Sequence, residues 1–133
     1  MIYEVRWTGK AVSSNRRLRS GRARMHGDPD YAAFKRSLSF TFAAARIKQR
    51  WQCTRDDVAV EIRAWLPARM DGEAVQKPVL DALELAGVVE NDRQCVDVRM
   101  QRMGTEEPAR IEVVARSVED VQKAIDAQEG VRI

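Results

Sequence analysis

The stretch Val58–Leu66 reads V-A-V-E-I-R-A-W-L and has the clearest strand pattern in the chain. Apolar residues occupy every second position, and Glu61, Arg63 and Trp65 lie between them. Because successive side chains of a β-strand point to opposite faces, this alternation predicts a strand with one face in the core. Pro67 lacks the amide hydrogen that strand pairing needs, so we expect the strand to end there.

A connector and a short helix are predicted after this strand, in the stretch Met70–Asp92 (M-D-G-E-A-V-Q-K-P-V-L-D-A-L-E-L-A-G-V-V-E-N-D). Pro78 limits how far the regular helix can extend toward the N-terminus, so we expect Lys77 to open it. Gly87 is placed as a residue just past a helix end. The apolar stripe of this helix consists of Val79, Leu80, Leu83 and Ala86.

A long helix is predicted before the strand. Asp28 can accept hydrogen bonds from the first helical turn, and Pro29 suits the first helical position. We expect the helix to run to about Trp51 and to be buried over a broad face. Its two apolar stripes are Phe34, Leu38, Phe42 and Ala45, and Phe40, Ala44, Ile47 and Trp51.

The N-terminal part should contain one strand and one long loop. Ile2 to Trp7 alternates between apolar and charged residues, as a half-buried strand does. Residues 8–27 contain three glycines, several serines and no apolar period, which predicts a loop. A loop of this length inside a small domain is usually functional or disordered.

The C-terminal part predicts two strands and a final helix. Gln94–Met103 and the stretch from Ile111 to Ala115 both alternate, and Gly104–Pro108 is a turn, so we expect an antiparallel hairpin. Ser117 and Asp120 resemble a capping box for a helix over about 117–129. The whole order is β-loop-α-β-α-β-β-α, which predicts a single α/β (α+β) domain with a mixed sheet packed with helices.

Composition narrows the class of protein. A chain of 133 residues can bury the core of one domain, and 44% apolar with 32% charged residues argues against disorder. No apolar stretch is long enough to span a bilayer and no signal-peptide pattern follows Met1, so we expect a cytoplasmic protein without membrane contact. Cys53 and Cys95 stand far apart with no clustered histidine, which predicts two buried, reduced thiols.

The positive charge of the chain is concentrated in the predicted loop. Asn15–Arg24 reads N-R-R-L-R-S-G-R-A-R, with five arginines and no acid. Such an uncompensated run favours a polyanion partner, although a solvated loop would have the same composition. The candidate phosphate contacts are Lys10, Arg16, Arg17, Arg19, Arg22 and Arg24.

Acids surround the predicted short helix in a spacing that suits a metal. Asp71 and Glu73 precede it and Asp92 follows it. Mg²⁺ prefers oxygen ligands, and a metal near a phosphodiester supplies hydroxide and neutralises growing charge. A turn at Gly72 would bring the first two acids together, and Asp92 would join them if the chain after the helix returns beside the connector. Lys77 would then contact the phosphate.

The same residues have ordinary structural explanations. Acids at a helix start interact favourably with the helix dipole without binding any metal. Lys77 and Asp81 are four positions apart, which is the spacing of a helical ion pair.

The stretch D-G-E-A-V-Q-K-P-V-L-D-A-L-E-L-A-G-V-V-E-N-D-R-Q resembles the signature of the RusA family of Holliday junction resolvases. That signature commonly has D-x-D-N-x-x-K, then L-D-A-L, then D-D-x-Q. The segments S-N-R-R-L-R-S-G-R-A-R and Y-A-A-F-K are similar to the basic loop and first helix of the family. In this chain Glu73 stands where the second aspartate is usual, Ala74 replaces the asparagine, and Asn91 replaces the first aspartate of the pair.

The resemblance implies a homodimeric endonuclease that binds four-way DNA junctions and nicks two strands symmetrically with Mg²⁺, for which Mn²⁺ would substitute. It implies that Asp71, Glu73 and Asp92 bind metal and act in catalysis with Lys77. The basic residues of the loop would then contact DNA. Two alternatives stay open, a branched-DNA-binding protein with weak or lost catalysis and a general basic nucleic-acid-binding domain.

Overall fold

The computed structural model of the protein describes residues 2–14, 18–20, 25–119, 122 and 125–127, with only the backbone described at 18–20 and 25–27. Its elements are β1 (Ile2–Gly9), β2 (Leu18–Ser20), β3 (Met25–Gly27), α1 (Pro29–Lys48), β4 (Val58–Leu66), α2 (Glu73–Leu85), the 3₁₀ helix η2 (Asp92–Gln94), β5 (Cys95–Thr105) and β6 (Ala109–Ser117).

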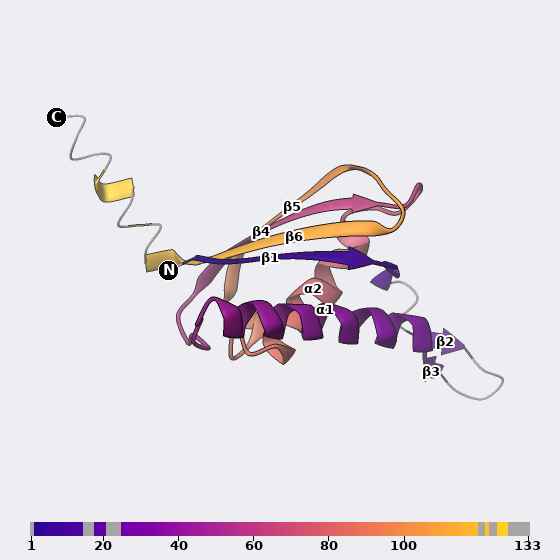
Figure 1. Ribbon diagram of the computed structural model, residues 1–133, viewed down its shortest axis with the longest axis horizontal. Helices are drawn as coiled ribbons and strands as arrows, with labels where there is room; N and C mark the ends of the chain where they lie inside the picture. Colours follow the sequence, from indigo (N-terminus) through magenta and orange to yellow (C-terminus); the bar gives the residue numbers. More distant parts are fainter. Residues whose placement is uncertain (1, 15–17, 21–24, 120–121, 123–124, 128–133) are drawn as a thin grey trace.

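Four of the strands form one mixed sheet in the order β1-β6-β4-β5. β6 pairs antiparallel with both β1 and β4, whereas β4 and β5 are parallel. Parallel neighbours need a crossover connection, and α2 provides it. α1 and α2 lie on the same face of the sheet (Figure 1). The predicted α+β domain with a mixed sheet is confirmed.

The predicted hairpin of the last two strands is wrong. β5 and β6 are joined by three residues, a length typical of a hairpin, but β4 lies between them in the sheet. β4 carries buried residues at alternate positions and its bounds match the prediction, so it takes the central place with a partner on each edge. Alternation in β5 and β6 predicted both strands but held no information on their order.

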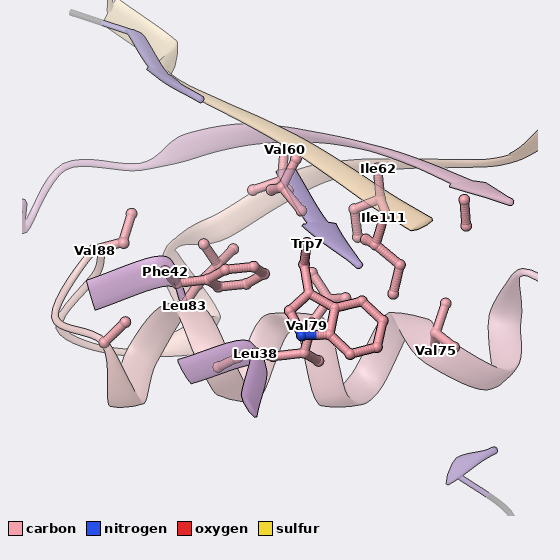
Figure 2. Packing of buried hydrophobic residues seen from close by; sticks show 14 of the residues in the cluster. Trp7, Leu38, Phe42, Val60, Ile62, Val75, Val79, Leu83, Val88 and Ile111 are labelled. Carbon is pink, nitrogen blue, oxygen red and sulfur yellow. The ribbon is translucent and has the colours of Figure 1, made fainter. Parts of the chain in front are cut away.

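The core lies between the sheet and the two helices. Val60 and Ile62 of β4 and Ile111 of β6 face Leu38 and Phe42 of α1 (Figure 2). Three buried aromatic side chains have their polar atoms paired. Tyr3 Oη donates to the Phe42 carbonyl at 2.7 Å, Trp51 Nε1 to the Val88 carbonyl at 2.9 Å, and Trp7 Nε1 to Ser37 Oγ at 2.9 Å.

The start of α1 follows the prediction, but its burial does not. Asp28 Oδ1 accepts from the amides of Asp30 at 2.8 Å and Tyr31 at 3.3 Å, as an N-cap residue does. Phe40 is 82% exposed and Ile47 is 68% exposed, so the expected burial over a broad face is wrong. Only one stripe of the helix faces the core, because the sheet and α2 cover one side of it. The buried residues of α1 are Tyr31, Phe34, Leu38 and Phe42.

The crossover helix α2 begins one turn earlier than predicted. It opens at Glu73 rather than at Lys77, and Pro78 is accommodated inside it. Its end matches the prediction, since Gly87 has a φ of 76°. The Gly87 amide donates to the Glu84 carbonyl at 3.1 Å and the Val88 amide to the Leu83 carbonyl at 2.9 Å, which forms a Schellman motif.

Three further predictions concern the N-terminal loop, the two cysteines and the C-terminal helix. The predicted loop over residues 8–27 contains the end of β1 and a two-stranded ribbon of β2 and β3. Cys53 is exposed rather than buried, and Cys95 is partly buried. In the expected final helix the described residues 118, 119, 122 and 125–127 are helical, whereas Ser117 ends β6 and Asp120 lies outside the described residues.

The unequal burial of two neighbouring phenylalanines predicts unequal losses of stability. Phe42→Ala should lower the free energy of unfolding by about 3–5 kcal/mol, since it leaves a cavity in the core. Phe40→Ala should change the free energy by less than about 0.5 kcal/mol, because its side chain is already in water. Urea denaturation followed by circular dichroism measures both. Similar losses for the two variants would contradict the assignment of the buried face of α1.

Candidate active-site groove

One groove of about 450 Å³ follows a face of α2. Its lining comes from helix positions at three- and four-residue spacing and from the start of η2, so a single helix face forms most of the wall. The lining residues are Glu73, Gln76, Lys77, Leu80, Asp81 and Asp92.

Asp81 forms ion pairs with two lysines beside the groove. Lys77 Nζ lies 3.7 Å from Asp81 Oδ1, and Lys35 Nζ of α1 lies 3.6 Å from Asp81 Oδ2. The Asp81 side chain is only 20% exposed, whereas that of Lys77 is 52% exposed. Asp81 therefore holds two ammonium groups beside the groove. The spacing to Lys77 was visible in the sequence, but the contact with Lys35 joins two helices and had no local signal.

Asp92 is fixed at its place by the residues on either side of it. Asn91 Oδ1 accepts from the Arg93 amide at 2.9 Å and caps η2. Gln94 Oε1 accepts from the amides of Glu90 at 2.9 Å and Asn91 at 2.8 Å, and its Nε2 donates to the carbonyls of Thr54 and Asp56, both at 2.8 Å. These bonds tie the segment that carries Asp92 to the chain just before β4.

Asp71 lies in the connector that follows β4. Val58 pairs with Cys95 and Leu66 with Thr105, so the segment before β5 lies at the start of β4. The residue after Asp71, Gly72, lies against Met100 and Arg102 of β5, which pair with Ile62 and Ala64 of β4. The expected meeting of Asp71 with Asp92 stays a prediction. The structure brings Glu73, Lys77 and Asp92 to one groove, and Asp71, which is exposed, is not among its lining residues.

The acids do not form a ready-made metal site. Among the described residues no three histidine, cysteine, aspartate or glutamate side chains are grouped as metal ligands. Glu73 and Asp81 are eight residues apart on one helix, which separates them by about 12 Å along the axis. Mg²⁺ holds its ligands at about 2.1 Å, so these two carboxylates cannot share an ion. The oxygen donors of Asp71, Glu73 and Asp92 suit Mg²⁺ by type, and their joint binding of an ion stays a prediction.

The pKa of Cys95, the first residue of β5, depends on two nearby acids. Burial raises the pKa of the Cys95 thiol, and the carboxylates of Asp92 and Glu84 add to this effect, so that the pKa is about 11. The negative charges of Glu84 in α2 and Asp92 in η2 thus act on the thiol of Cys95.

The basic residues can be placed only in part. Lys10 is exposed directly after β1, and the backbone of Arg19 belongs to β2. The other candidate phosphate contacts, Arg16, Arg17, Arg22 and Arg24, lie outside the described residues. Their role in binding stays a prediction.

Comparison with protein families gives one match, to the model described as endodeoxyribonuclease RusA, over residues 9–116. This span covers most of the chain. The chain belongs to the RusA family of endodeoxyribonucleases. The resemblance found in the sequence is confirmed, and membership in RusA supports nuclease activity on branched DNA. The match includes every residue that lines the groove and ends before the C-terminal helical residues.

A search among curated proteins found no match to this RusA chain. Within the described residues, no helix has the length and apolar character needed to cross a membrane.

The two cysteines should differ in their reactivity with iodoacetamide. Cys53 is exposed and should be alkylated first. Cys95 should react at least about tenfold more slowly at pH 8.5, because the thiolate is the nucleophile and its raised pKa leaves most of the group protonated. Its rate should rise as the pH approaches 11. Mass spectrometry of tryptic peptides measures both rates.

Asp92→Asn tests whether the Asp92 carboxylate lies close to the Cys95 thiol. Removing this carboxylate should lower the pKa of Cys95 and accelerate its alkylation at fixed pH. Asp97→Asn is the control. Asp97 lies on β5, as Cys95 does, but it is not among the charges that raise the pKa of Cys95. Equal rates in both variants would contradict the position assigned to Asp92.

Proposed function

We propose that this protein is a Mg²⁺-dependent, structure-selective endonuclease that resolves four-way DNA junctions in recombination and repair. It would act in the cytoplasm as a homodimer, which supplies two copies of one site for two symmetric nicks. Mn²⁺ would replace Mg²⁺. The observation that carries the proposal is the RusA match over residues 9–116, which contains the groove with its lysine and acids.

Lys77 is the proposed contact for the scissile phosphate. Its side chain is half exposed, and its ammonium is held at 3.7 Å from Asp81 in a groove that is open to solvent. A point charge in this position can stabilise negative charge that grows on a phosphate during cleavage. Lys35 would add a second positive charge through the same carboxylate.

Asp71, Glu73 and Asp92 are the proposed carboxylates for catalysis and Mg²⁺ binding. A bound Mg²⁺ would supply a hydroxide near neutral pH and neutralise phosphate charge. Support comes from the oxygen chemistry of the three side chains and from the shared groove of Glu73 and Asp92. Asp71 is not among the residues that line this groove, so its place in the set rests on the family resemblance.

Departures from the family signature favour a second candidate from another class, a branched-DNA-binding protein with weak or lost catalysis. Glu73, Ala74 and Asn91 depart from that signature, and Asp71 is not among the residues that line the groove. Such a protein would bind junctions through its basic loop without cutting them. A general basic nucleic-acid-binding domain would instead bind junctions and linear duplex alike.

Carboxylate removal tests the proposed catalysis. Asp71→Asn, Glu73→Gln and Asp92→Asn should each lower the rate of junction nicking at least about a hundredfold, because several kcal/mol of transition-state stabilisation is lost. The rate is measured on a synthetic four-way junction and on linear duplex, with and without Mg²⁺. Asp97→Asn is the matched control, since Asp97 is an exposed acid of β5 outside the groove.

The outcomes separate the candidates. Paired nicks that need Mg²⁺ and all three acids support the nuclease. Tight junction binding by the wild-type protein without nicks supports the binding protein. Equal affinity for junction and duplex leaves the general basic domain.

Neutralising the arginine run should weaken binding in a salt-dependent way. A variant with Gln at Arg16, Arg17, Arg19, Arg22 and Arg24 should bind the junction less tightly at low salt. The slope of log K against log salt should become shallower by about 0.9 for each phosphate that the variant no longer neutralises. Fluorescence anisotropy without Mg²⁺ measures the slope. Arg63→Gln is the control, because Arg63 is already paired with Glu61 at 3.0 Å; an unchanged slope in the multiple variant would rule out the run as the DNA-binding surface.

A further inference from the structure

Arg102 of β5 holds the connector that carries Asp71. Its Nε donates to the Met70 carbonyl at 2.9 Å, and its Nη2 donates to the carbonyls of Leu66 and Pro67, each at 3.2 Å. The same Nη2 donates to Thr105 Oγ1 at 3.2 Å. One side chain is therefore bonded to the last residue of β4, to the first residue after it and to the residue directly before Asp71.

Apart from its bonds to Arg102, the connector bonds locally. The carbonyls of Asp71 and Gly72 accept from the amides of Ala74 and Val75 in α2, each at 3.1 Å. The Met70 amide donates to the Pro67 carbonyl at 3.2 Å, and Arg69 between them has a φ of 70°, a left-handed conformation that costs a non-glycine residue energy. The connector also packs closely on β5. A Cβ added at Gly72 would lie 3.1 Å from Met100 Cγ and 3.7 Å from Arg102 Cβ.

The guanidinium is suited to this task by its shape. Its donors project from a rigid plane and can reach several carbonyls at once, whereas a lysine ammonium is a single point on a flexible stem. Within the described part of the chain, Arg102 has no carboxylate at ion-pair distance, unlike Arg99 of the same strand, which pairs with Asp97 at 3.8 Å. The charge of Arg102 is thus directed at backbone carbonyls.

We propose that Arg102 is a positioning residue, which fixes the connector over residues 67–72 and thereby the place from which Asp71 acts. This inference rests on the proposed function. Arg102 would contact neither DNA nor metal. Its effect on cleavage would pass through the order of the connector.

Hydrogen exchange tests the order of the connector without any nuclease assay. In Arg102→Gln, the amides of residues 68–72 should exchange at least about tenfold faster than in the wild-type protein, because the connector loses its bonds to β5. Arg102→Lys should fall between the two. Arg99→Gln removes the same charge from the same strand and should leave this exchange unchanged. Unchanged exchange in Arg102→Gln would overturn the inference.

Cleavage kinetics test the consequence for the site. Arg102→Gln should lower the single-turnover nicking rate about tenfold or more, while the Kd for the junction measured without Mg²⁺ stays within about twofold. Arg102→Lys should recover part of the rate. A raised Kd with an unchanged nicking rate would overturn the inference and make Arg102 a DNA-binding residue.

The two measurements keep this inference distinct from the proposed function. If the wild-type protein does not nick junctions, the proposed function fails and the positioning role of Arg102 in cleavage fails with it, whatever the exchange shows. If the wild-type protein nicks and Arg102→Gln nicks equally fast with a disordered connector, only the positioning role is overturned.

Discussion

The parallel pairing of β4 and β5 is the constraint on which the rest of the structure depends. Parallel neighbours cannot be joined by a tight turn, so the chain must leave the end of β4, cross over one face of the sheet and re-enter at the start of β5. α2 makes this crossing and lies beside α1, so the same helix closes the core and presents the groove. The crossover also assigns the acids to their places. Asp71 lies in the connector that follows β4, and Asp92 lies in η2, directly before β5.

Features that depend on a few neighbouring residues were predictable from the sequence. The bounds of β4, the N-cap of α1 at Asp28 and the left-handed Gly87 each follow from local rules of strand alternation, capping and backbone freedom. The order of the strands was not predictable in this way. A three-residue link after β5 favours a hairpin locally, but the central position of β4 is decided by contacts between distant parts of the chain. The exposure of Phe40 depends likewise on how much of α1 the other elements cover.

The candidate site likewise combines features that the sequence could predict with features that depend on tertiary packing. Glu73, Lys77 and Asp81 share one face because four-residue spacing on a helix fixes it, and their spacing in the sequence already contained this information. The second ammonium at Asp81 comes from Lys35 on α1 and required the packing of two helices. The expected meeting of Asp71 with Asp92 depends on how the connector and the chain after α2 pack, which no local pattern specifies. Arg102 had no motif at all, since its partners are carbonyl groups that any sequence provides.

The departures from the family signature have unequal physical weight. At position 91 the side-chain oxygen caps η2 by accepting from the Arg93 amide, and an amide oxygen does this as well as a carboxylate oxygen. The change to asparagine therefore leaves the placement of Asp92 intact, because Gln94 and the cap still tie the segment to the start of β4. Glu73 is different, since it opens α2 and has no cap or ion pair within the described residues that fixes its longer side chain. An exposed carboxylate with an extra rotatable bond loses more conformational entropy when it is held at a metal. Position 73, rather than position 91, is thus the departure from the family signature that bears most on the proposed metal site.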